Sequence, residues 1–166
     1  MSLPDLAAVL WRQRDLLERL TYRLECEQLL LAAGRNRWIG VATSEVERVL
    51  EELRIVEMQR AVVADQVARS VGLDPGATLE ELASAAQPPW TGVLIEHRQA
   101  LITLSAELSA VAEANRHLIE AGARGVDAAL RDLSEGGGLR SAIGYDAHGR
   151  TNLVATAARA GVDRAL

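Results

Sequence analysis

The sequence predicts an all-α protein: an antiparallel three-helix bundle (up-down-up) with a short connecting helix and a flexible C-terminal tail. Three long stretches carry apolar residues at intervals of three and four, the spacing that places them on one face of an α-helix. No stretch shows the apolar–polar alternation of a strand. With three Trp, two Tyr and no Phe, the core must consist of Leu, Val and Ala, which suits helices packed side by side.

The first predicted helix covers about residues 4–33. Leucines recur every seven residues and others fill the positions between them, as in a coiled coil. The heptad leucines are Leu3, Leu10, Leu17, Leu24 and Leu31. Residues 34–36 (Gly-Arg-Asn) form a helix stop. Trp38 and Ile39 follow, and they either plug the end of the bundle or form an exposed contact.

The second predicted helix starts at residues 44–47, because Ser-x-x-Glu is a capping box. Its apolar seam is interrupted by Arg60, and the turn residues 72–76 end it. A weaker second stripe implies a second neighbouring helix; it consists of Ile55, Met58 and Val62. Another capping box, Thr-x-x-Glu at 78–81, predicts the short connecting helix.

The third long helix runs from Trp90 to about residue 133, after a Pro-Pro pair. The three long helices have similar expected lengths, roughly 40–48 Å at ~1.5 Å per residue. The apolar seam of the third contains His97 and Asn115. Buried polar residues usually fix helix register and order, and we assign this role to His97 and Arg60. Asn115 suits a structural role and a role in partner binding equally well.

The helical pattern weakens beyond Ile119. Gly122 and Gly125 each cost about 1 kcal/mol relative to Ala within a helix, so the helix either continues weakly or hinges there. Three glycines at 136–138 end it. We therefore predict a helical bundle over residues 1–133 and a flexible C-terminal tail over residues 134–166.

The net charge of −5 argues against a general binder of nucleic acid or of anionic membranes. The acidity belongs to the bundle, since residues 1–133 hold 14 Arg and 20 acidic residues, and residues 134–166 hold 4 and 3. A single Cys excludes an intrachain disulfide and fits a reducing cytosol. No apolar run approaches the ~20 residues needed to cross a bilayer. We expect a cytoplasmic protein without membrane insertion.

No catalytic or metal-binding pattern is evident. His97 and His117 lie twenty positions apart on one predicted helix, roughly 30 Å at ~1.5 Å per residue, so they cannot share an ion. The glycines at 136–138 lack the Lys and Ser/Thr of a phosphate loop. The acidic residues of the second helix are expected to be solvated, whereas a general acid–base pair would need burial. We predict no catalytic residue, no metal and no cofactor.

Four stretches, in this order and spacing, resemble the FlgN-like flagellar export chaperones of high-GC Gram-positive bacteria. They are residues 10–18 (LWRQRDLLE), 29–38 (LLLAAGRNRW), 45–50 (EVERVL) and 112–119 (AEANRHLI). The resemblance covers about residues 5–133. It implies a protein that keeps hook–filament junction (hook-associated) proteins soluble and export-competent. It further implies delivery of these clients to the flagellar type III export apparatus.

The resemblance places the client-binding region toward the C-terminal helix. The matching residues here are Asn115, Leu118, Ile119, Val126, Leu130 and Leu133. Family members often carry a second Asn just past the first, whereas His117 and Leu118 follow Arg116 here. An apolar surface of this kind would receive an amphipathic helix of the client. We hypothesise that Val126, Leu130 and Leu133 become ordered on binding together with Ile143 or Leu153.

Two alternatives to the chaperone come from other classes of protein. The heptad leucines of the first helix would also suit a non-enzymatic helical scaffold or a self-associating coiled coil. A scaffold should form a stable oligomer, whereas a chaperone should be a monomer or weak dimer. The third possibility, an enzyme with an unrecognised site, would need a polar pocket that this composition hardly supports.

Overall fold

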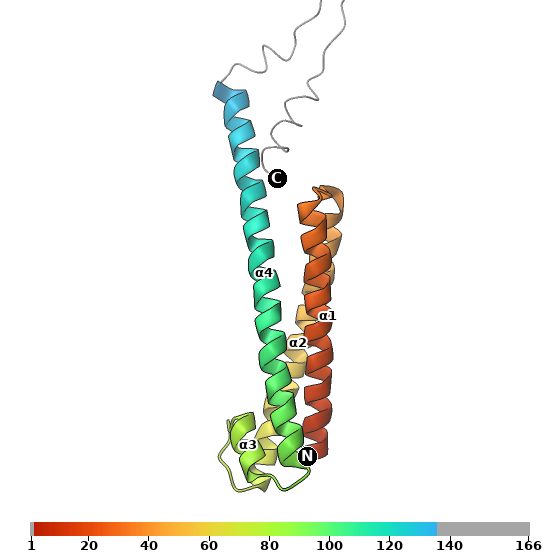
Figure 1. The fold of residues 1–166 in the computed structure, drawn as a ribbon, viewed down its shortest axis with the longest axis vertical. Coiled ribbons are helices and arrows are strands. Elements are labelled where there is room, and N and C mark those ends of the chain that lie inside the picture. The colour runs from red at the N-terminus through yellow and green to blue at the C-terminus, as the bar shows by residue number, and fades with distance from the viewer. Residues whose placement is uncertain (1, 136–166) are drawn as a thin grey trace, which may run out of the picture. The chain divides into compact units, whose positions relative to one another are not determined.

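The computed structural model describes residues 2–135, and this part of the chain is helical with no strand. Four helices follow one another: α1 (Leu3–Ala32), α2 (Asn36–Ser70), α3 (Leu79–Ala85) and α4 (Trp90–Glu135) (Figure 1). The all-α class and the short connecting helix are therefore confirmed. Nearly all of the predicted tail, residues 134–166, lies outside the described residues, and the predicted boundary at residue 133 stays a prediction.

The chain forms two compact units, residues 1–113 and residues 114–166. The first unit contains α1, α2, α3 and the first part of α4. The second contains, within the described residues, the rest of α4. The helix continues through Gly122 and Gly125, so of the two outcomes predicted for this stretch, continuation is the one observed.

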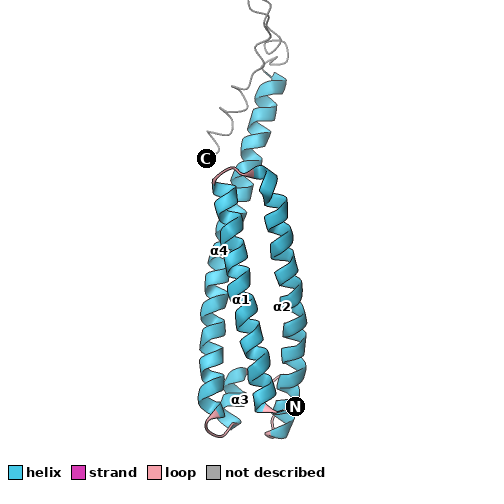
Figure 2. Ribbon diagram, turned by 90° about the vertical axis from the view of Figure 1, so that its right-hand side faces the viewer, coloured by secondary structure: helices cyan, strands magenta, loops and turns pink. Residues whose placement is uncertain are grey.

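Helices α1 and α2 lie side by side and run antiparallel (Figure 2). Arg19 on α1 pairs with Glu52 on α2 at 3.2 Å. One turn further along α1, Arg23 pairs with Glu45 at 2.8 Å. As the residue numbers rise along α1, the numbers of the paired residues fall along α2, so the two helices run antiparallel. These ion pairs are largely solvated, so each contributes less than about 1 kcal/mol to stability.

Helix α2 begins at Asn36, so the start predicted from the capping box at 44–47 was wrong. The chain turns at Gly34, whose φ of +62° is readily available only to glycine. The N–H of Arg35 donates to the carbonyl of Leu30 at 2.9 Å, which satisfies a free carbonyl at the end of α1. This tight turn lets α2 start at once, and Ser44 consequently lies inside the helix.

Trp38 does not plug the end of the bundle, since 47% of its surface is exposed. It lies in the first turn of α2, where the guanidinium carbon of Arg37 sits 4.7 Å from its ring centroid. Ile39 is only partly buried. The plug is therefore wrong, and an exposed contact at Trp38 stays a prediction.

Substituting Gly34 in the turn and Gly40 in α2 by alanine should change the free energy of unfolding in opposite directions. Gly34→Ala should destabilise the protein by about 1 kcal/mol, because alanine tolerates a positive φ poorly. Gly40→Ala should stabilise it by about 1 kcal/mol, because Gly40 lies inside α2 with open space around its Cα. Urea unfolding of both variants measures the changes. A neutral Gly40→Ala would contradict a helix that begins before residue 44.

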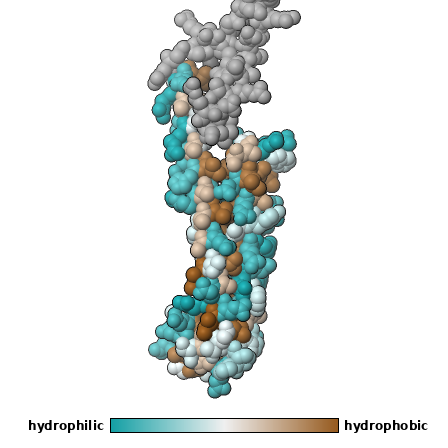
Figure 3. All heavy atoms as spheres, in the orientation of Figure 1, coloured by the Kyte–Doolittle hydropathy of each residue, from teal (hydrophilic) through white to brown (hydrophobic). Residues whose placement is uncertain are grey.

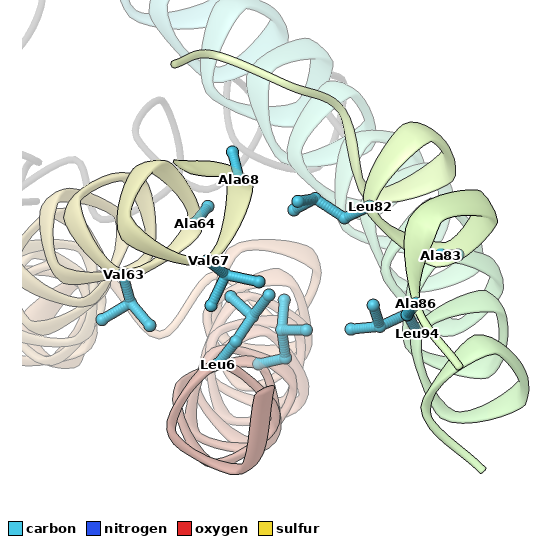
Figure 4. Close-up of a cluster of buried hydrophobic side chains, with 10 residues drawn as sticks. Leu6, Val63, Ala64, Val67, Ala68, Leu82, Ala83, Ala86 and Leu94 are labelled. Atoms are coloured by element: carbon cyan, nitrogen blue, oxygen red, sulfur yellow. The ribbon is translucent and has the colours of Figure 1, made fainter. Parts of the chain in front are cut away.

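The first core cluster joins all four helices. It consists of Leu6, Leu10, Val63, Ala64, Val67, Ala68, Leu82, Ala83, Ala86 and Leu94. Its side chains point into the space between the helices (Figure 4). Helix α3 reaches this cluster because Thr78 caps it: the Thr78 hydroxyl accepts from the N–H of Glu81, and the Glu81 carboxylate accepts from the N–H of Thr78. The capping box predicted at 78–81 is confirmed.

The second core cluster lies further along α1 and α2. Its buried members are Leu16, Leu17, Leu20, Leu24, Val46, Val49, Leu53 and Val56. Four residues of the first part of α4 pack against it while partly buried: Leu101, Leu104, Leu108 and Val111. Three of the heptad leucines of α1, Leu10, Leu17 and Leu24, are thus used inside the protein's own core.

Candidate functional site

The described part of α4 beyond residue 113 carries an exposed row of large apolar residues, which we call the α4 stripe. It consists of Ile119, Val126, Leu130 and Leu133, with exposed fractions of 45–60%. Their spacing of seven, four and three residues places them on one face of the helix. Large apolar side chains aligned on one face are typical of a surface that binds another protein.

The α4 stripe continues the register of the seam that packs inside the first unit. Leu94 is fully buried in the first core cluster, and Leu101 and Leu108, at seven-residue steps, pack against the second. Val126 follows Leu108 by eighteen residues, which is five turns at 3.6 residues per turn. The seam therefore contributes to the core before residue 113, is still buried at Asn115, and is exposed at Val126, Leu130 and Leu133.

The two remaining described residues of the predicted binding region differ from the stripe. Leu118 is partly buried, and Asn115 is buried with 3% of its surface exposed. The structure thus groups four of the six described residues on one exposed face and withdraws the Asn115 side chain from the surface. Ile143 and Leu153 lie outside the described residues.

The residues that flank the α4 stripe are a glycine without a side chain and several charged residues. At Gly122 the helix carries no side chain, and a Cβ added there would meet no described atom within 4 Å. Arg116 and Arg124 both pair with Glu120, at 3.8 and 4.0 Å. These pairs are exposed and solvated. The apolar stripe, and not a charged patch, is therefore the distinctive feature of this stretch.

Other apolar side chains also reach the surface, in the first unit (Figure 3). The exposed large apolar residues on α2 are Trp38, Val41, Ile55, Met58 and Val62. Between α1 and α2, Val9 and Val63 line a shallow groove with Met58, Gln59 and Val62. The weaker stripe of α2, predicted to contact a second helix, is thus largely exposed, because the core seam of α2 faces the other way.

A polar cluster interrupts the contact between α1 and α4 in the first unit. His97 is buried, with 2% of its surface exposed, and its ring meets Trp11 edge-on at a centroid distance of 5.0 Å. The Arg14 guanidinium lies over the same indole at 4.2 Å and reaches Glu96 at 3.6 Å. Burial lowers the pKa of His97, the Arg14 charge lowers it further, and Glu96 opposes both effects.

Neither a metal site nor a membrane-spanning helix is found within residues 2–135. Within that range no three His, Cys, Asp or Glu side chains are grouped so as to hold a metal ion. None of the helices in that range combines the length and the apolar character needed to cross a membrane.

These features define a class: a helical protein with one long amphipathic helix whose seam is partly uncovered, suited to binding another protein. A family model described as FlgN protein matches residues 1–152, so the chain belongs to the FlgN family. The resemblance inferred from the sequence is thereby confirmed. FlgN proteins are flagellar chaperones, and the family is not known for enzymatic activity. Searches of curated proteins and of solved structures gave no match.

Proposed function

We propose that this protein is a cytosolic type III export chaperone that binds hook–filament junction proteins and keeps them soluble and export-competent. The observation that carries the proposal is the α4 stripe, an apolar face in the register of a core seam with no core cluster on it among the described residues. A client would supply an amphipathic helix to cover it. The flagellar export apparatus is the second partner that we propose.

The fold that we propose for this function is an up-down-up bundle of α1, α2 and the first part of α4. The antiparallel ion pairs between α1 and α2 support it. So does the order of the α4 contacts, in which Leu94 meets the first core cluster and Leu101 to Val111 meet the second. Such a bundle would stay folded while the rest of α4 binds and releases the client.

Truncation tests the proposal directly. A chain that ends at Ala121 keeps the first unit and both core clusters but lacks Val126, Leu130 and Leu133. We expect it to melt cooperatively by circular dichroism and to lose binding to a purified hook–filament junction protein in calorimetry. If the truncated chain bound the client with the affinity of the full chain, the assignment of the site would be wrong.

The helical scaffold remains the second candidate because of the heptad leucines of α1. However, Leu10, Leu17 and Leu24 are buried in the protein's own core, so this seam is already occupied. We therefore propose a monomer or weak dimer. Sedimentation velocity distinguishes the two candidates: a scaffold forms a stable oligomer alone, whereas the chaperone shifts to a larger species when client is added.

A further inference from the structure

The polar cluster between α1 and α4 has no part in the proposed client binding, and a role in helix register does not account for its ionisable side chains. It consists of Trp11 and Arg14 on α1 and Glu96 and His97 on α4. Among residues 2–135, no group hydrogen-bonds the buried Nδ1 atom of His97, nor the buried Nε and Nη1 atoms of Arg14. Buried polar atoms without hydrogen bonds destabilise the contact that contains them.

We propose that this contact is a proton-controlled switch. Proton uptake by His97 loosens residues 90–113 of α4 from α1, and proton release lets them pack again. The inference goes beyond the proposed chaperone function and does not depend on it.

Burial favours the neutral form of the His97 ring in the packed state. At 2% exposure, His97 packs edge-on against Trp11 as an uncharged side chain. A proton added to it would be a second positive charge next to Arg14, which already lies over the same indole. Both charges would be largely shielded from water, since the Arg14 side chain is 16% exposed and His97 is 2% exposed, and like charges repel more strongly under such shielding. The packed state therefore resists protonation, and an opened state, in which water reaches the ring, does not.

The other charged groups offset this repulsion only in part, since the pKa of His97 stays lowered despite the Glu96 carboxylate. Glu96 is the carboxylate that acts on His97, but its side chain is mostly exposed and already pairs with Arg14 at 3.6 Å. Arg98, the next charge on α4, pairs with Glu80 of α3 at 2.9 Å. The charged residue that the sequence places on the core seam of α2 is Arg60, another cation, which is partly buried.

The direction of the pH dependence follows. Burial and Arg14 hold the pKa of His97 in the packed state below its ordinary value of about 6.5, the value expected once the ring is solvated. The opened state thus binds more protons. The contact is at full strength above about pH 6.5 and weakens as the pH falls below it. Each unit of pKa depression allows up to a roughly tenfold increase in the opening constant.

Hydrogen exchange of the full-length protein, read by mass spectrometry at pH 7.5 and 5.5 and corrected for intrinsic exchange rates, tests the switch. We expect faster corrected exchange in residues 90–113 at the lower pH, with a smaller change in α1 and α2 up to residue 56. His97→Leu and His97→Gln should each abolish this difference. His117→Leu, at an exposed histidine on the same helix, should leave it intact.

Two substitutions that flank the histidine should shift the NMR titration of His97 in opposite directions. Arg14→Gln should raise its pKa toward the ordinary value, and Glu96→Gln should lower it further. These shifts test whether both charges act on the ring, whereas the hydrogen-exchange comparison tests whether the contact opens. The proposal is overturned if His97 titrates at or above its ordinary pKa in the wild-type protein. A pH-dependent opening that persists in His97→Gln would also overturn it.

Discussion

Replacing Val126 and Leu130 together by serine is expected to weaken client binding by at least about 100-fold. Both side chains lie at the centre of the α4 stripe and are more than half exposed. The residues that dominate a protein interface lie near its centre and cost about 2 kcal/mol or more when truncated, about 30-fold in affinity, and we expect Val126 and Leu130 together to reach at least this range. Isothermal calorimetry with a purified hook–filament junction protein gives the change in dissociation constant.

The matched control replaces Ile95 and Ile102 by serine. These residues are exposed to a similar degree on the same helix, seven residues apart, but they belong to the first unit and lie outside the stripe. We expect client affinity to stay within about threefold and both variants to keep the wild-type melting temperature within a few degrees, as surface substitutions usually do. Equal losses of affinity in the two double variants would exclude the stripe as the specific site.

The largest effect on stability is expected from Leu20→Ala. Leu20 has 1% of its surface exposed in the second core cluster, where α1 and α2 meet. Removing its side chain loses buried apolar contacts and leaves a cavity, which costs about 3–5 kcal/mol in comparable leucine substitutions. Urea unfolding followed by circular dichroism measures the loss as a lower midpoint.

Leu29→Ala on the same helix is the chemically identical control. Leu29 is 70% exposed, so its truncation should change the free energy of unfolding by less than about 0.5 kcal/mol. A large loss at Leu29 would mean that its side chain is covered in solution, for example by a second copy of the chain. In that case a self-associating helical scaffold would become the better explanation of the heptad leucines of α1.

Local sequence signals were sufficient to predict the start of a helix where no other turn nearby had already started it. Thr78 and Glu81 start α3 as predicted, because the capping box there follows turn residues and precedes a short apolar pattern. The same capping-box pattern at 44–47 wrongly predicted the start of α2, because Ser44 and Glu47 lie inside that helix. The positive φ of Gly34, and the Arg35 N–H that satisfies a carbonyl at the end of α1, decided where α2 begins.

The candidate site was predictable in part. The spacing of Val126, Leu130 and Leu133 follows from helical periodicity, and the resemblance to FlgN proteins directed attention to this helix. Neither could reveal that these side chains are exposed whereas Asn115 is buried. Exposure depends on which neighbours pack against a face, and periodicity carries no information about neighbours.

The residue pattern alone was enough to predict the helices and the alignment of their apolar seams, because helix periodicity and caps act over a few neighbouring residues. The family followed from the resemblance of four stretches to FlgN proteins, and the family model matches residues 1–152. Helix packing determines that the α4 seam is part of the core at Leu94 and exposed at Val126. It also determines that His97 lies beside Arg14 and Trp11. Burial and charge proximity arise from contacts between residues far apart in the chain, and such contacts are set only when the helices pack.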